Sequence, residues 1–434
     1  MKKLWQKDGA KLNPKIEAYT VGDDYQLDNQ LFPYDLKASI AHVQGLVKVK
    51  ILSGRESRRL AKALSQIQKD WQKGKIKIKV TDEDCHTVIE NLLIKKLGDL
   101  GGKVHTGRSR NDQILVAMRL FMKDNSDKIG GLILDLAQTL LAKAEQYKKI
   151  PFPGYSHTQQ AMISSVGHYY ASFLESLCDD FELLIKIKDQ IDQNPLGSAA
   201  GFGVNLPLAR DYVSRRLKFK KIQLNSLYCQ NSKGKFESLF LEALAQIMMT
   251  VGKLASDLII FTTQEFSFFR VKDSMTTGSS IMPQKKNMDI LEVIRGNVSV
   301  IFANQILIKD LNKNTFSGYN RDTQLMKKPL LESVKIVKET LVVMKIFLEN
   351  IAPDTGQILN KIKGDILMAD AALELSKKQG RPFREAYQQI AREPINGQAD
   401  YVAEIKKKVS LGAAGNLHLD LYRQKIKKLS QSFF

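Results

Sequence analysis

Residues 236–263 of the chain read FESLFLEALAQIMMTVGKLASDLIIFTT. Apolar side chains recur there at alternating intervals of four and three residues, at Phe240, Leu244, Ile247, Val251, Leu254 and Leu258. This period places them on one face of an α-helix. At 1.5 Å per residue the segment would span roughly 40 Å, so the sequence predicts a helix long enough to cross a whole domain.

Four further segments show the same period, at residues 131–146, 164–189, 289–310 and 329–350. Several long helices with apolar faces are typical of a helix bundle, so we expect a mostly α-helical protein. Shorter breaks rich in glycine or polar residues separate them, and such loops often carry the chemistry. We expect three consecutive domains, namely an N-terminal helical domain (1–109), a central long-helix bundle (110–359) and a small C-terminal helical domain (360–434).

The composition is that of a globular protein. Of 434 residues, 43% are hydrophobic and 26% are charged, which argues against a disordered or fibrous chain. No apolar run approaches the ~18 residues of a membrane span, and the N-terminus has no signal-peptide core. Three separated cysteines, Cys85, Cys178 and Cys229, form no CxxC pair, which fits a reducing compartment. We therefore expect a cytoplasmic protein without a membrane partner.

The net charge of +20 permits two interpretations. An excess of 66 Lys and Arg over 46 Asp and Glu could mark a nucleic-acid partner. Alternatively, it could reflect a solvated lysine-rich surface. Lysines outnumber arginines and are spread along the chain, whereas specific nucleic-acid readers rely on arginine. We therefore favour the lysine surface and expect no nucleic-acid partner.

The most unusual motif is HTGRSRNDQ at residues 105–113. It places Arg108 and Arg110 directly before an apolar, helix-like run. A helix starting near Asn111 would point its positive end and free N–H groups at the same place, which suits a carboxylate or a phosphate. The alternative is a polar turn in which Asn111 or Asp112 caps the helix.

Two other segments carry candidate chemistry. Residues 276–287, TTGSSIMPQKKN, bring Ser279 close to Lys285 and Asn287, which can stabilise a developing oxyanion; the alternative is a flexible surface loop. Residues 154–160, GYSHTQQ, place His157 before a helix expected from about residue 160, where it could be a catalyst or a capping residue. No motif for a metal, nucleotide or flavin is recognisable, so we expect no metal and no cofactor.

Taken together, these segments resemble the argininosuccinate lyase family of the fumarase/aspartase superfamily. Residues 278–287 resemble the superfamily's signature loop, and residues 105–113 match the family's own form in every position. Residues 154–159 and YNRDTQLMK at 319–327 are similar to two further family segments, as are Leu4 and Trp5 and the run DEDCH at 82–86.

The resemblance implies a three-domain, mostly α-helical subunit of a homotetramer, with the central bundle as oligomer core and active sites shared between subunits. The implied reaction is a reversible, cofactor-free β-elimination of argininosuccinate, a small-molecule substrate, to arginine and fumarate in arginine biosynthesis. It proceeds through an aci-carboxylate intermediate.

The resemblance also assigns roles to residues. Ser279 would be the base, Lys285 and Asn287 would stabilise the aci-carboxylate, and His157 paired with Glu292 would supply or relay the acid proton. The substrate would be held by a second group: Asp24, Asp28, Ser109, Arg110, Asn111, Ser156, Tyr319, Gln324 and Lys327.

Two positions depart from the family pattern. Met288 stands where proline is usual in the family. Asp24 stands where many members have serine, and this second difference bears on specificity for the arginine end of the substrate. Alternatives are a lyase for another succinyl substrate, including an N-acylated argininosuccinate, and a catalytically silent structural homologue.

Overall fold

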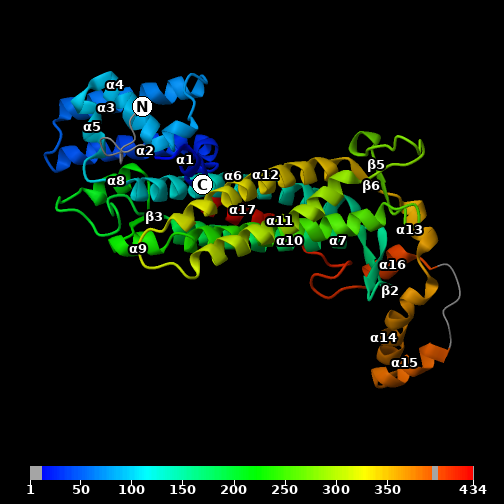
Figure 1. Cartoon of the computed structure of the whole chain (residues 1–434). Coiled ribbons are helices and arrows are strands. Elements are labelled where there is room, and N and C mark those ends of the chain that lie inside the picture. Colours follow the sequence, from blue (N-terminus) through cyan, green and yellow to red (C-terminus); the bar gives the residue numbers. More distant parts are fainter. Residues whose placement is uncertain (1–11, 393–398, 434) are drawn as a thin grey trace. The chain divides into compact units, whose positions relative to one another are not determined.

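A computed structural model describes residues 12–392 and 399–433 of the chain (Figure 1). Leu4 and Trp5, which contributed to the family resemblance, lie outside these residues. The chain divides into two compact units: unit 1 comprises Met1–Lys128, Leu184–Ala245 and Val300–Lys335, and unit 2 comprises Ile129–Leu183, Gln246–Ser299 and Ile336–Phe434. The division into three consecutive domains stays a prediction.

Five long helices dominate the described residues, which confirms the predicted mostly α-helical fold. They are α6 (Arg110–Tyr147), α7 (Val166–Ile191), α10 (Lys235–Phe261), α11 (Asp289–Asn312) and α12 (Lys327–Glu349). Four predicted segments agree with these helices to within two residues at each end. The fifth, 131–146, is only the second half of the 38-residue α6. Each long helix contributes residues to both units.

The N-terminal helices of unit 1 surround an apolar core. They are α1 (Pro14–Val21), α2 (Asp24–Lys48), α3 (Gly54–Gln72), α4 (Cys85–Leu97) and α5 (Asp99–Gly102). Buried side chains such as Phe32, Leu36, Leu64 and Leu93 join α2, α3 and α4. Ser53 fixes the start of α3, since its Oγ accepts the N–H of Glu56. This packing holds α2 and α4 in place, and both carry side chains of the candidate site.

Smaller elements complete unit 1. They are two helices, α8 (Arg210–Arg216) and α9 (Ser226–Asn231), the parallel strands β3 (Gln193–Asn194) and β4 (Lys221–Ile222), and the 3₁₀ turns Val80–Asp82, Lys103–His105 and Arg321–Met326.

Unit 2 contains a hairpin, a small second sheet and short helices. The strands are β1 (Pro151–Ser156) with β2 (Gln159–Ser165) and β5 (Phe269–Val271) with β6 (Ile351–Pro353), each pair antiparallel. The helices are α13 (Thr355–Lys361), α14 (Met368–Gln379), α15 (Phe383–Arg392), α16 (Tyr401–Lys406) and α17 (Leu419–Phe433), with 3₁₀ turns at Asp273–Met275 and Gly364–Leu367. Phe152 of β1 packs against Phe261, Phe268 and Phe269, which anchors the hairpin to the unit's core.

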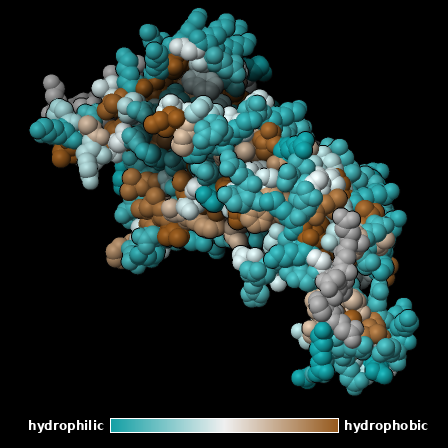
Figure 2. All heavy atoms as spheres, turned by 90° about the vertical axis from the view of Figure 1, so that its right-hand side faces the viewer, coloured by the Kyte–Doolittle hydropathy of each residue, from teal (hydrophilic) through white to brown (hydrophobic). Residues whose placement is uncertain are grey.

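Two segments are long and apolar enough to cross a membrane by length and composition alone, Ser226–Phe261 and Asp289–Asn312. Both segments contain charged residues, such as Lys253 and Asp257 in the first, so neither is the uninterrupted apolar run that the expectation concerned. In the first, half of the most apolar window is buried inside the protein, as in the core helix of a globular protein; in the second, 28% is buried. Figure 2 shows apolar side chains in patches among the hydrophilic surface.

Candidate active site

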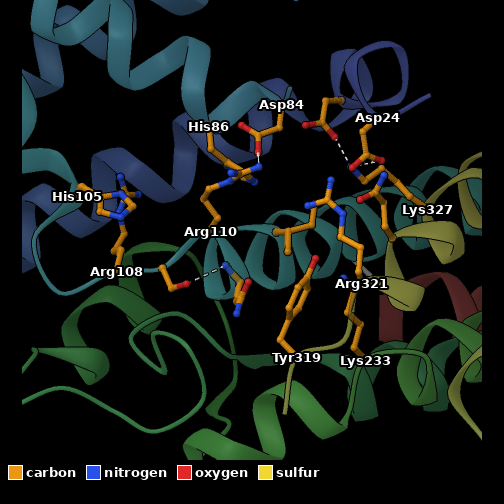
Figure 3. A pocket seen from close by; sticks show the side chains of 15 residues that line it. Asp24, Asp84, His86, His105, Arg108, Arg110, Lys233, Tyr319, Arg321 and Lys327 are labelled. Atoms are coloured by element: carbon orange, nitrogen blue, oxygen red, sulfur yellow. Dashed lines mark hydrogen bonds and ion pairs between the residues drawn. The ribbon is translucent and has the colours of Figure 1, made fainter. Parts of the chain in front are cut away.

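A polar cavity of about 400 Å³ lies in unit 1, between segments that are far apart in the sequence (Figure 3). Its walls come from the start of α2, the start of α4, the link into α6, the link into α10 and the region before α12. The lining residues are Asp24, Asp28, Asp84, His86, His105, Arg108, Ser109, Arg110, Asn111, Ile114, Lys233, Tyr319, Arg321, Gln324 and Lys327.

A buried lysine bridges two aspartates on one wall of the cavity. The Nζ atom of Lys327 lies 2.5 Å from Asp28 Oδ1 and 3.0 Å from Asp24 Oδ1. Asp28 is fully buried, and its Oδ2 accepts the backbone N–H of Cys85 at 2.9 Å. Burial alone would raise the pKa of Asp28, but Lys327 and then His86 bring it below its ordinary value. Burial raises the pKa of Asp24, and Lys327 opposes this only in part. With two carboxylates for one ammonium, the cluster can accept a further cationic group.

A second ion cluster involves Arg110, the first residue of α6. Its guanidinium contacts Asp84 and lies 3.1 Å from Glu83 Oε1. Burial lowers the pKa of Arg110, but the two carboxylates outweigh that effect and raise it. Arg321 lies 3.4 Å from the same Glu83 oxygen and donates to the carbonyl of Thr20 at 2.7 Å. Protein carboxylates therefore already neutralise much of the charge of Arg110.

Arg108 and His86 are buried basic side chains that line the cavity. Arg108 is 8% exposed and donates to Ser39 Oγ at 2.8 Å. His86 Nδ1 lies 3.2 Å from Asp35 Oδ2. Burial lowers the pKa of His86, but Asp35 and two further aspartates raise it above its ordinary value. The surrounding carboxylates therefore favour the protonated form of this imidazole.

Short polar side chains fix the N-terminus of α6. Ser109 Oγ accepts the N–H of Asn111 at 3.2 Å, and Asp112 Oδ1 accepts the N–H of Ser109 at 2.9 Å. Asp112 Oδ2 accepts the N–H groups of Gly197 and Ala199 at 2.9 and 3.0 Å. The segment is thus both a helix cap and part of the cavity wall, because Ser109 and Asn111 line the space toward which the helix start points its positive end.

Lys233 is a buried lysine without an ion-pair partner among the described residues. It lies in the link between α9 and α10, is 7% exposed, and its Nζ lies 5.3 Å from the centroid of the Tyr319 ring. Figure 3 shows it beside Tyr319. Burial first, and then the charge of Lys327, lower its pKa to about 8. The cavity therefore contains one cation that a bound anion could pair with.

In unit 2, His157 stands at the tip of the β1–β2 hairpin. His157 and Thr158 both have positive φ, 50° and 61°, and form the turn between the strands. The helix expected from about residue 160 is therefore wrong, since residues 159–165 form β2 and α7 starts at Val166. Ser156 and His157 are exposed, so the hairpin presents them to solvent in the single chain.

The loop 276–287, also in unit 2, is closed at its base by a backbone bridge between Thr277 and Asn287. Ser279 Oγ accepts the N–H of Met282 at 3.2 Å and that of Ile281 at 3.4 Å. Lys285 is exposed, and Glu292 is exposed in the first turn of α11. Within this chain the structure gives no contact between His157 and Glu292, so their pairing stays a prediction.

The cavity thus gathers most of the predicted substrate-binding residues. They are Asp24, Asp28, Ser109, Arg110, Asn111, Tyr319, Gln324 and Lys327. Ser156 and the predicted catalytic residues Ser279, His157, Glu292, Lys285 and Asn287 belong to unit 2.

Several lining residues were not predicted as site residues. Asp84, His86, His105 and Arg321 lie inside motifs that the sequence already singled out, and that proximity was the available signal. Lys233 had no such signal.

The fold matches solved lyase structures over almost the whole chain. A variant of EDDS lyase with bound fumarate superposes with a TM-score of 0.81 at 21% identity, covering 98% of this chain and 91% of that one. The class II fumarase of Schistosoma mansoni gives 0.73 at 14% identity, covering 86% and 91%. The chain therefore has the fold of the fumarase/aspartase superfamily of lyases.

Sequence comparison narrows this class. Residues 16–303 match the model of the Lyase family. The argininosuccinate lyase of Thermotoga neapolitana is 41% identical over 90% of this chain and 97% of its own length, and that of Sorangium cellulosum is 41% identical over 96% and 97%. The chain belongs to the argininosuccinate lyase family.

Proposed function

We propose that the protein is a cytoplasmic argininosuccinate lyase that splits argininosuccinate into arginine and fumarate for arginine biosynthesis. The observation that carries this is identity of 41% with argininosuccinate lyases across nearly the whole chain. The cavity supports it, because it offers both acidic and basic groups to a substrate that carries an ammonium, a guanidinium and three carboxylates.

The cavity side chains suit the two ends of this substrate. Asp24 and Asp28 supply two carboxylates against the one ammonium of Lys327, so their cluster can bind the ammonium at the arginine end of the substrate. The buried ammonium of Lys233 can pair with a substrate carboxylate. At the start of α6, Ser109 and Asn111 donate to a succinyl carboxylate, which the positive helix end also attracts.

The elimination itself is assigned to the residues of unit 2. Ser279 takes the proton from the carbon next to a carboxylate, and the electron pair moves into that carboxylate. Lys285 and Asn287 stabilise the resulting aci-carboxylate, where the charge grows. His157, paired with Glu292, protonates the leaving guanidinium nitrogen as the C–N bond breaks and fumarate forms.

We infer that the active protein is a homotetramer in which subunits complete one another's sites. Two observations support this: the exposed position of His157 and Lys285, and the apolar surface of α11. On that helix Val293, Phe302, Ile306 and Leu307 are exposed by 36–65%. Such a surface is typical of a protein–protein contact.

A fumarate-release assay tests the function. Purified protein with argininosuccinate should produce fumarate, followed by its ultraviolet absorbance. N-acetyl-argininosuccinate and adenylosuccinate, supplied in parallel, distinguish the other succinyl substrates. A preparation that binds argininosuccinate without releasing fumarate would be a silent homologue, and the proposal would be wrong.

A further inference from the structure

Three metal-ligating side chains meet in unit 1, and one of them, His86, lines the cavity. Asp35 belongs to α2, and Cys85 and His86 are the first residues of α4. One ligand atom from each, a carboxylate oxygen, the thiol sulfur and a ring nitrogen, lies within 4.8 Å of the others. Asp35 and Cys85 are fully buried, and His86 is 4% exposed.

Their spacing is close to that of a tetrahedral zinc site. His86 Nδ1 lies 3.2 Å from Asp35 Oδ2 and 3.8 Å from Cys85 Sγ. With Zn–S near 2.3 Å and Zn–N and Zn–O of about 2.0–2.2 Å, the tetrahedral edges are about 3.4 Å for N···O and about 3.6 Å for S···N. Both observed distances lie within about 0.2 Å of these edges, and the ligating oxygen of Asp35 lies within 4.8 Å of Cys85 Sγ.

The Asp35 carboxylate is fully buried, and its partner in the cluster is the His86 ring, whose Nδ1 lies 3.2 Å from Asp35 Oδ2. Neither oxygen forms a hydrogen bond of ordinary geometry with the described residues. Buried carboxylates are normally hydrogen-bonded, so the lone pairs of this group are incompletely used. A metal ion between Asp35 and His86 would replace their ion pair.

We propose that Asp35, Cys85 and His86 form a binding site for a thiophilic divalent cation, with Zn²⁺ the best match. His86 lines the cavity, which provides both an entry path and room for water as the fourth ligand. The ion would join α2 to α4 beside the substrate cavity. This site is independent of the proposed lyase reaction.

Cobalt titration of the purified full-length protein tests the site. Co²⁺ alone should give a thiolate-to-cobalt charge-transfer band that saturates at one ion per chain, and Zn²⁺ should displace it. Cys85→Ala should abolish the band, while Cys178→Ala and Cys229→Ala, which alter the other two buried free cysteines, should retain it. Far-UV circular dichroism verifies that each variant is folded.

A second variant keeps the test decisive if Cys85→Ala does not fold. Asp35→Asn retains the thiolate ligand but weakens the oxygen ligand, so the band should persist with affinity lower by at least about tenfold. Absence of the band in the wild-type protein, or its persistence in folded Cys85→Ala, would overturn the proposal. Neither result depends on whether the protein releases fumarate.

Discussion

The Ser279 hydroxyl accepts two backbone N–H groups, from Ile281 and Met282. Such donors favour the alkoxide and help a hydroxyl to act as a base. Ser279→Ala is predicted to lower kcat by roughly 10²–10⁴-fold with little change in KM, because a base acts mainly in the transition state. Steady-state fumarate release measures both constants. Ser280→Ala, in the adjacent exposed serine, is the matched control and should stay near normal. Normal turnover by Ser279→Ala would exclude this role.

Lys233 should give substrate binding a pH dependence. Its pKa is about 8, so it is charged below that pH and neutral above it. The charged groups that affect it are Lys327, Arg321, Glu237 and Asp24. If its ammonium binds a substrate carboxylate, KM should increase as the pH rises through 8.

Lys233→Arg serves as the comparison, since a guanidinium stays charged across this range. Its KM should stay flat where that of the wild type rises, whereas any pH effect on the elimination step is common to both proteins. Identical KM profiles for the two proteins, measured by fumarate release, would rule out Lys233 as the source.

The same residue shows the limit of prediction from sequence. The run 105–113 concentrates charged, hydroxyl and amide groups in nine residues, and such a concentration can be recognised without a structure. Lys233 lies in an unremarkable run, Ser232 to Lys235, and looks like any surface lysine. Only the packing of α9, α10 and the segment around Tyr319 buries it, and that packing depends on residues far apart in the sequence.

At the scale of elements, Asp112 joins α6 to the segment near residue 197. Its carboxylate accepts the N–H groups of Ser109, Gly197 and Ala199, and it is fully buried. Asp112→Ala would leave these three donors without an acceptor. An unsatisfied buried donor costs about 1–3 kcal/mol, so we expect the free energy of unfolding to fall by at least about 2 kcal/mol.

Denaturant titration measures this loss for Asp112→Ala. Asp112→Asn keeps one side-chain oxygen acceptor and should lose less. Asp211→Ala, in the first turn of α8, is a control outside this group of hydrogen bonds and should change the free energy of unfolding little. If Asp112→Ala and the wild type had equal free energies of unfolding, the hydrogen bonds to Asp112 would not stabilise the fold as predicted.

The elements that could be predicted from the sequence are those marked by a local repeat, and those that could not depend on tertiary contacts. The repeat of three and four residues is a local property, so the long helices were recognisable to within two residues at most ends. The β1–β2 hairpin was not, because its turn residues His157 and Thr158 adopt positive φ without the glycine or asparagine that usually signals such a turn. The hairpin is held by distant contacts, including the bond from Gln160 Nε2 to the carbonyl of Lys361 at 2.7 Å.

At the scale of the whole molecule, the compact units are interleaved along the chain. The three consecutive domains expected from the sequence stay a prediction. The unit boundaries fall inside uninterrupted helices, and even Gly130 and Gly131, next to the boundary in α6, do not break that helix. The predicted site residues are divided in the same way: most predicted binding residues lie in unit 1, while Ser156 and the predicted catalytic residues lie in unit 2. The motifs of the site could therefore be recognised one by one, but sequence could not show how the chain, or a second chain, assembles them.

The proposed tetramer leads to a prediction about the exposed apolar face of α11. Ile306 is 65% exposed on α11, beside the exposed Leu307 and Phe302. If this surface is a subunit contact, Ile306→Asp buries an unpaired charge there and should dissociate the assembly. Light scattering after size-exclusion chromatography should change from four times the 49.0 kDa chain mass to a smaller species. Fumarate release should fall in parallel, because each site would lose residues from its neighbours.

Leu411→Asp, an equally drastic change at a 75% exposed loop position, should leave both mass and activity intact. An Ile306→Asp protein that remains a tetramer would exclude this face, and a fully active monomer would show that one chain completes its own site.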